Sequence, residues 1–168
     1  MTVAIRAGKL SGPVLAGGPV LAVGVVLAAV ALGGPAESAA GAEYYPVAGS
    51  TASMNPPFSE AVRVGNMLYV SGTIGLDKSG KLVDGGVTAE AKQAMESIGA
   101  TLKRHGSSFD EIVQCAVALA DIKDWPAFND VYRRYFTAHF PARMAFATAG
   151  LALGAHVEVQ CNATVKAM

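Results

Sequence analysis

The most regular pattern of apolar and polar positions lies near the C-terminus, in residues 156–165. The odd-numbered residues there are Val, Val, Cys, Ala and Val, and the even-numbered ones are His, Glu, Gln, Asn and Thr. Such alternation is typical of a β-strand that packs one face on a hydrophobic core. The sequence therefore predicts a strand whose other, polar face meets water or another subunit.

Two longer segments show the three-to-four-residue spacing of amphipathic helices. The first spans residues 88–105, with Thr88 as its N-cap, and its apolar stripe is Ala91, Ala94, Met95, Ile98 and Leu102. The second begins at Asp124 as its cap and ends near Phe140, because Pro141 disfavours further helix. Its residues predicted to face the core are Phe128, Val131, Tyr132, Tyr135 and Phe136.

Shorter β-rich runs account for the remaining regular structure. Residues 61–75 predict a hairpin around Gly65-Asn66, and residues 112–120 and 143–149 predict single strands. The whole order is ββαβαββ. This order favours a two-layer α+β domain with a mixed β-sheet and both helices on one face.

The N-terminal segment has a different character. Residues 1–42 begin with Arg6 and Lys9, continue through the apolar run 19–32 and end in small residues, as a secretory signal peptide does. An uncleaved membrane anchor, or a start site assigned upstream of the true one, are the alternatives. We expect an exported protein, periplasmic or secreted and free of the membrane after cleavage. Residues 43–58, rich in Ser, Pro, Gly and Asn, predict a loose arm before a domain at 59–168.

Composition and charge narrow the classes of partner. Of the 168 residues, 52% are hydrophobic and 15% are charged, which excludes a disordered chain. Leaving out Arg6, Lys9 and Glu37 with residues 1–42, the remainder carries 11 basic and 12 acidic side chains. Because nucleic-acid binding depends on the neutralisation of phosphates, this near-neutral body predicts no nucleic-acid partner.

Cysteine and histidine usage gives no sign of a metal centre. Cys115 and Cys161 lie on the apolar parity of predicted strands, where buried free thiols are the simpler interpretation. An exported protein could also join them in a disulfide. His105, His139 and His156 lack the spacing of metal ligands, and no CxxC motif is present.

Four motifs from residue 61 to residue 165 carry a family resemblance. They are VGNMLYVSGTIGLDKSGKLV, LADIKDWPAFNDVYRRYF, FPARMAF and HVEVQCNATV. Together they resemble the Rid family, also called YjgF, of reactive-intermediate deaminases. The resemblance covers nearly all of the chain that follows the N-terminal segment.

The resemblance implies a fold, an activity and site residues. The fold is a chorismate-mutase-like α+β domain, assembled as a homotrimer whose sheets form a central barrel with sites between subunits. Active members hydrolyse 2-imino acids or enamines to 2-keto acids and ammonia without metal or organic cofactor. Arg143 would hold the substrate carboxylate, and Glu158 would be the acid/base near the attacking water. The cleft-lining positions are Ser71, Asn129, Tyr132 and Phe58.

Two departures from the family pattern support an alternative function. Phe58 stands where many deaminating members have a tyrosine, and Ala145 stands where many have a cysteine. The alternative is a non-catalytic trimer that binds a small carboxylate as a sensor, carrier or chaperone-like protein. A ribonuclease, another function attached to the family, is disfavoured by the near-neutral charge.

The spacing of Arg143 and Glu158 makes a geometric prediction. If the last two strands form a hairpin that turns near Leu153, the two residues lie roughly 13 Å apart, at about 3.3 Å per residue along a strand. We therefore expect no ion pair between them within one chain.

Overall fold

The computed structural model describes residues 41–50 and 56–165. The predicted signal peptide falls almost entirely outside these ranges, and so do its alternatives. Within them, no helix has the length and hydropathy needed to cross a membrane. The strands are β1 (Glu43–Tyr45), β2 (Ala61–Val64), β3 (Met67–Val70), β4 (Thr73–Ile74), β5 (Ile112–Leu119), β6 (Ala142–Ala147) and β7 (Val157–Thr164), and the helices are α1 (Gly86–Arg104) and α2 (Trp125–Tyr132).

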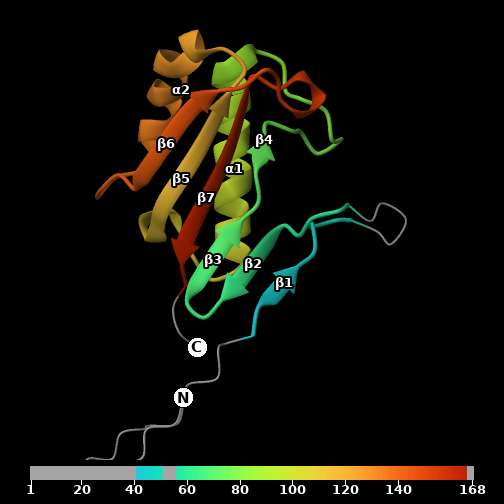
Figure 1. Ribbon diagram of the computed structural model, residues 1–168, viewed down its shortest axis with the longest axis vertical. Helices are drawn as coiled ribbons and strands as arrows, with labels where there is room; N and C mark the ends of the chain where they lie inside the picture. Colours follow the sequence, from blue (N-terminus) through green and yellow to red (C-terminus); the bar gives the residue numbers. More distant parts are fainter. Residues whose placement is uncertain (1–40, 51–55, 166–168) are drawn as a thin grey trace, which may run out of the picture. The chain divides into compact units, whose positions relative to one another are not determined.

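All seven strands join one mixed sheet (Figure 1). The strand order is β1-β2-β3-β7-β5-β6, with β4 also paired to β7, and β5 and β6 form the parallel pair. The predicted hairpin of the last two strands is therefore wrong. A parallel pair needs a crossover connection, which α2 supplies between β5 and β6. β7 then pairs on the other side of β5, antiparallel to it.

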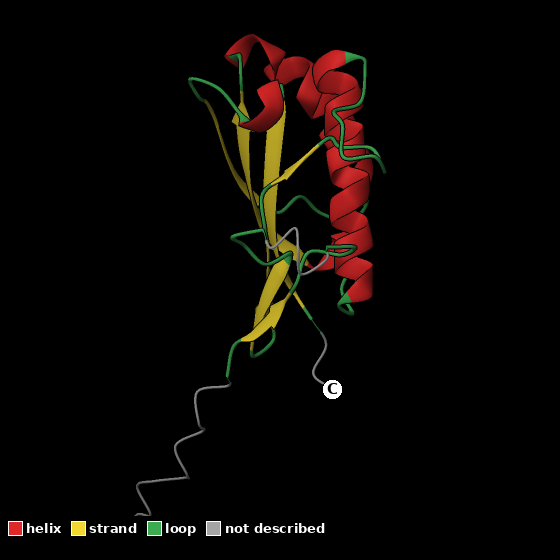
Figure 2. Ribbon diagram, turned by 90° about the vertical axis from the view of Figure 1, so that its right-hand side faces the viewer, coloured by secondary structure: helices red, strands yellow, loops and turns green. Residues whose placement is uncertain are grey.

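The domain has two layers, with both helices on one face of the sheet (Figure 2). The predicted apolar stripe of α1 is completely buried, and Phe128 of α2 is buried beside it. The odd-numbered residues of β7 face these helices, and its even-numbered residues are only partly buried. The α+β fold predicted from the sequence is thus confirmed, with β1 and β4 added to the predicted order.

The first helix begins differently from its prediction, whereas the second begins as predicted, with Asp124 in the N-cap position. Gly85, with a φ of 116°, precedes α1, and Thr88 provides no cap. The backbone enters the helix through a left-handed residue, which glycine adopts without steric cost. The Asp124 side chain makes no capping hydrogen bond to α2, and it is Asp121 that caps the preceding 3₁₀ turn, where it accepts a hydrogen bond from the Lys123 amide.

The second helix is also shorter than predicted. α2 ends at Tyr132, and a 3₁₀ turn, η3 (Arg133–Tyr135), continues it. Residues 136–140 then leave the helix in an irregular path before β6. Proline prevents a helix from continuing through it but does not require the helix to reach it, so Pro141 marked an outer limit of the helix rather than its end.

The two cysteines form a disulfide, which corrects the preference for free thiols. Cys115 of β5 and Cys161 of β7 are direct cross-strand partners, and both side chains are completely buried. Closely spaced antiparallel partners bring their Cα atoms to about 4.5 Å, and here the separation is 4.1 Å. The β5–β7 register, which the sequence did not give, is what brings the two sulfur atoms together.

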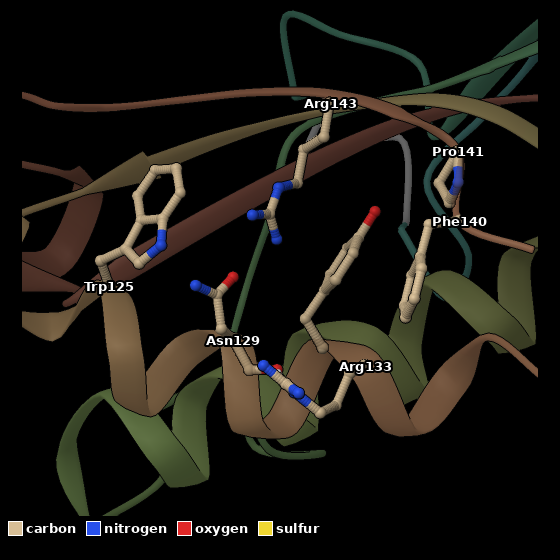
Figure 3. A pocket seen from close by; sticks show the side chains of 7 residues that line it. Trp125, Asn129, Arg133, Phe140, Pro141 and Arg143 are labelled. Atoms are coloured by element: carbon tan, nitrogen blue, oxygen red, sulfur yellow. Dashed lines mark hydrogen bonds between the residues drawn. The ribbon is translucent and has the colours of Figure 1, made fainter.

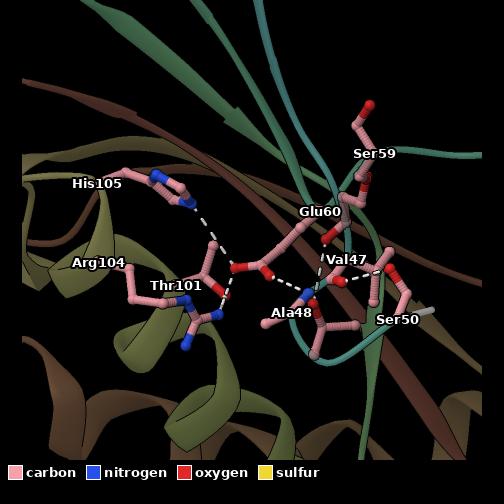
Figure 4. A network of polar contacts seen from close by, with 10 residues as sticks. Val47, Ala48, Ser50, Ser59, Glu60, Thr101, Arg104 and His105 are labelled. Atoms are coloured by element: carbon pink, nitrogen blue, oxygen red, sulfur yellow. Dashed lines mark hydrogen bonds and ion pairs between the residues drawn. The ribbon is translucent and has the colours of Figure 1, made fainter. Parts of the chain in front are cut away.

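The arm is held to the domain at its start by a short strand and a polar network. β1 pairs with β2, although the sequence predicted a loose arm there. The Glu60 carboxylate accepts hydrogen bonds from the Ala48 amide and from Arg104 of α1 (Figure 4). Tyr45 stacks on His105, with the ring centroids 4.0 Å apart. Burial raises the pKa of the Glu60 carboxyl, but these hydrogen bonds outweigh it and hold that pKa below its ordinary value.

Candidate functional site

The Arg143 side chain lies between β6 and α2, on the helix side of the sheet. Its guanidinium carbon lies 5.1, 5.8 and 4.8 Å from the ring centroids of Trp125, Phe128 and Tyr132. Cations within about 6 Å of an aromatic face are attracted by its electron density. No hydrogen bond or ion pair engages the guanidinium within the described part of the chain. Five N–H donors are therefore positioned by aromatic rings rather than by an acidic partner.

A pocket of about 520 Å³ opens beside this guanidinium (Figure 3). α2 supplies one wall, and β6 with the segment before it supplies the other. The lining residues are Trp125, Asn129, Tyr132, Arg133, Phe140, Pro141 and Arg143. Aromatic walls with a few convergent polar groups are typical of small-molecule sites. The available donors make this pocket suitable for an anion such as a carboxylate.

Tyr132 serves both the core and the pocket. Its ring packs on Phe128 and Phe136, as its helical spacing predicted. Its hydroxyl is buried and has no hydrogen-bond partner among the described residues. Burial raises the pKa of this phenol to about 12, against a smaller lowering by the Arg143 charge. The hydroxyl therefore stays neutral at physiological pH and can donate a hydrogen bond to a ligand.

Glu158 lies on the opposite face of the sheet. Within the ladder, Arg143 and Cys161 are both aligned with Cys115, whereas Glu158 is aligned with Ala118, three residues further along β5. An odd offset along a strand reverses the side-chain direction. Two strand spacings of about 4.8 Å and three residues of about 3.3 Å put the two backbones roughly 14 Å apart.

The predicted absence of an ion pair between Arg143 and Glu158 is confirmed for this chain. The five ion pairs of the described residues do not include it. The physical reason is different from the predicted one, because β5 separates the two strands and the side chains point to opposite faces.

Glu158 has its own surroundings at the junction of β3 and β4. A Cβ atom added at Gly72 would overlap the Glu158 carboxylate, so the backbone there passes directly over it. Ser71 is next to this glycine, but its hydroxyl donates to the Ser59 carbonyl oxygen at 2.6 Å. Only a residue without a side chain permits this approach.

The structure thus divides the predicted site residues into two groups. Arg143, Asn129 and Tyr132 share the pocket beside α2, which we call the arginine pocket. Glu158 and Ser71 lie by Gly72 on the other face, which we call the glutamate site. Phe58 is 58% exposed before β2 and lines no part of the arginine pocket.

Several lining residues were not assigned to a site from the sequence. Trp125 and Arg133 flank Asn129 at helical spacing, so the face that holds Asn129 also presents them. Phe140 and Pro141 directly precede the strand that carries Arg143. The helical spacing around Asn129 and the position of Phe140 and Pro141 just before Arg143 could both be read from the sequence. No group of three or more His, Cys, Asp or Glu side chains that could hold a metal ion occurs in the described ranges.

Comparisons of the sequence with known proteins identify relatives of this chain. The sequence model of the family described as Endoribonuclease L-PSP matches residues 50–165. Over 108 residues, 64% of this chain, the chain is 49% identical to a Capra hircus protein and 45% identical to a human one; each alignment covers 79% of the relative. Both are named 2-iminobutanoate/2-iminopropanoate deaminase.

Solved structures agree with the sequence comparison. Yeast Mmf1 matches with a TM-score of 0.65 and 32% identity, over 77% of this chain and 98% of the yeast chain. RidA from a Psychrobacter species matches with a TM-score of 0.64 and 32% identity, over 73% of this chain and 94% of its own. The motifs, the fold and these matches agree, and the chain belongs to the Rid (YjgF) family, whose sequence model bears the name Endoribonuclease L-PSP.

Proposed function

We propose that this protein hydrolyses 2-imino acids, and the enamines in equilibrium with them, to 2-keto acids and ammonia. The observation that carries the proposal is the Arg143 guanidinium, which is positioned by aromatic rings and has no hydrogen-bond or ion-pair partner among the described residues. An arginine fork binds a carboxylate with two parallel hydrogen bonds. The names of the relatives in goat and human support the same reaction.

The reaction needs a bound carboxylate and an activated water. A protonated imine is already electrophilic, so Arg143 would hold the substrate while water adds to the imine carbon. The Glu158 carboxylate would take a proton from that water and return it to the nitrogen. The C–N bond then breaks while the hydroxyl formed from the water gives its proton to Glu158, so ammonia leaves and the carbonyl forms; Glu158 passes that proton to the departing ammonia or to solvent. Such proton transfer contributes about 10² to 10⁴ in rate.

This mechanism requires the arginine pocket of one subunit to meet the glutamate site of another. The homotrimer implied by the family resemblance is therefore part of the proposal. Two features support it: the separation of Arg143 and Glu158 within one chain, and the large apolar side chains exposed on the sheet. The exposed apolar residues of β3, β5 and β6 are Tyr69, Val113, Met144 and Phe146.

We further propose that the protein works outside the cytoplasm, after export by the segment 1–42. The Cys115–Cys161 disulfide supports this location, since disulfides persist mainly in oxidising compartments. The physiological imine would then be one formed or released outside the cytoplasm.

Ammonia release from enzymatically generated 2-iminobutanoate tests the proposed activity. We expect turnover by the wild-type chain and a loss of about 10²-fold or more in kcat/KM in Arg143→Ala, because the fork and its charge are both removed. Unchanged turnover in Arg143→Ala would refute the role of this residue. Binding of 2-oxobutanoate without any ammonia release would instead favour the non-catalytic carboxylate-binding alternative.

A further inference from the structure

The arginine pocket carries more positive charge than one carboxylate requires. Within one chain, the described residues that line it contribute two guanidinium groups, those of Arg143 and Arg133, and no acidic side chain. Its volume of about 520 Å³ lies within the range of sites for ligands much larger than a three-carbon acid. The composition of the lining therefore favours a ligand with two separate acceptor groups.

The inner end of the pocket can hold the first acceptor group. Arg143 and Tyr132 both line the pocket; Tyr132 is only 4% exposed, and its buried hydroxyl has no hydrogen-bond partner among the described residues. A buried hydroxyl without a partner loses its hydrogen bonds to water on folding, and a bound ligand oxygen would restore one.

The mouth of the pocket holds the second guanidinium. The Arg133 side chain is 64% exposed, and its Nε donates to the Asn129 carbonyl oxygen at 3.2 Å. The same Nε lies 3.8 Å from a carboxylate oxygen of Asp130. Its two terminal nitrogens have no acceptor within the described chain, so they are available to an anion. In Figure 3 the Asn129 carboxamide lies between the guanidinium groups of Arg143 and Arg133.

We propose that this pocket selects 2-imino and 2-oxo acids with a second carboxylate, of four or five carbons. Arg143 and Tyr132 hold the carboxylate next to the reacting carbon, and Arg133 with the Asn129 carboxamide holds the distal one. The proposal rests on the proposed function, since it assigns the first carboxylate to Arg143. It adds a substrate class and makes Arg133 the residue that determines it.

Two five-carbon ligands test this selectivity. 2-Oxoglutarate and 2-oxopentanoate differ by the distal carboxylate, and calorimetry on the full-length oligomer measures the affinity of each. We expect about 10-fold tighter binding of 2-oxoglutarate, the gain typical of one charge-assisted contact at a partly exposed site. Equal affinities, or tighter binding of 2-oxopentanoate, would overturn the proposal.

Two arginine variants assign the effect to a residue. Arg133→Gln should abolish the preference for 2-oxoglutarate. Arg134→Gln is the matched control: Arg134 lies in the same turn, and its Nε donates to the Asp130 carbonyl oxygen, but it lines a different pocket. Arg134→Gln should therefore keep the preference. An equal loss in both variants would indicate general surface charge and contradict the role of Arg133.

Tyr132→Phe separates a binding role from a packing role. We expect about 10-fold weaker binding of both ligands, with a melting temperature equal to or above that of the wild type, because the variant removes an unpartnered buried hydroxyl. A lower melting temperature with unchanged affinity would show that the hydroxyl has no part in binding. Wild-type turnover of 2-iminobutanoate, a monocarboxylate, reports on the proposed function independently of these outcomes.

Discussion

The arginine pocket and the glutamate site present their charges in opposite ways. Three aromatic rings surround Arg143, whose donors have no acceptor in the part of the chain that the structure describes, whereas Glu158 lies on the other face of the sheet beneath the backbone of Gly72. A cation on aromatic rings is positioned without being neutralised. A carboxylate beneath a glycine is confined sterically. The proposed function assigns each chain half of a site, one half for binding and the other for proton transfer.

Mixing two inactive variants gives the largest expected effect. Arg143→Ala and Glu158→Gln alone should each lose about 10²-fold or more in activity, the first by removing the clamp and the second by removing the base. In trimers reassembled from an equal mixture, each site between subunits has about one chance in four of combining both intact residues. We therefore expect recovery of about a quarter of the wild-type activity after co-refolding. No recovery would show that the two regions do not share a site between chains.

Removal of the disulfide tests the link between the two regions. Cys115 of β5 is aligned with Arg143 of the neighbouring strand, and Cys161 lies on β7, the strand that carries Glu158. The disulfide therefore links the strand beside the arginine pocket to the strand of the glutamate site. The bond closes a 46-residue separation, so the double change to alanine should lower the free energy of unfolding by about 2 to 4 kcal/mol.

Urea denaturation with and without reductant measures this effect. The wild type in reductant should resemble the double variant, and the variant itself should not respond to reductant. Equal stability of all four samples would mean that the two cysteines are not joined in solution.

A methyl group at Gly72 should disturb the glutamate site alone. Its Cβ would displace the Glu158 carboxylate, which is the flexible end of a side chain. We expect Gly72→Ala to lower kcat about 10-fold with little change in KM, since proton transfer and not carboxylate binding is affected. Gly150→Ala is the control, because a Cβ there meets no atom within 4 Å. An increase in KM without a change in kcat would place Gly72 in the binding half instead.

The smallest expected effect concerns the hydrogen bonds of Glu60, which lies next to the glutamate site in the structure. The Glu60 carbonyl oxygen accepts from the Ser71 amide, next to Gly72, and the Glu60 carboxyl has a pKa below its ordinary value of 4.5. A lowered folded-state pKa gives stability that is present above 4.5 and is lost as the pH falls through the folded value. Glu60→Gln should therefore lower the free energy of unfolding by about 1 kcal/mol at pH 7.

Denaturation measured from pH 7 to pH 3 tests whether the stability contributed by Glu60 is lost as the pH falls. The difference between Glu60→Gln and wild type should shrink progressively below pH 4.5, where the wild-type carboxylate becomes protonated. A difference that stays constant across this range would mean that the ionised carboxylate is not the source of the stability.

Some of the candidate site could be predicted because its signals are local. Asn129 and Tyr132 are three residues apart on one helix, so their common face followed from helical geometry alone. Arg133 belongs to the same stretch and was missed because an exposed arginine is the usual surface residue. The grouping of Glu158 with Gly72, and its separation from Arg143, depend on the pairing of β4 and β5 with β7, which no local pattern specifies.

The sequence by itself determined the apolar stripe of α1, the alternation of β7, the turn at Gly65-Asn66 and the motifs of the family, because each depends on spacing along a continuous stretch. Tertiary structure alone decided that β6 lies beside β5, that Cys115 meets Cys161 and that Arg143 and Glu158 face opposite ways. Strand order depends on how the crossover through α2 packs on the sheet. Such packing joins residues far apart in the chain, and their spacing in the sequence does not record it.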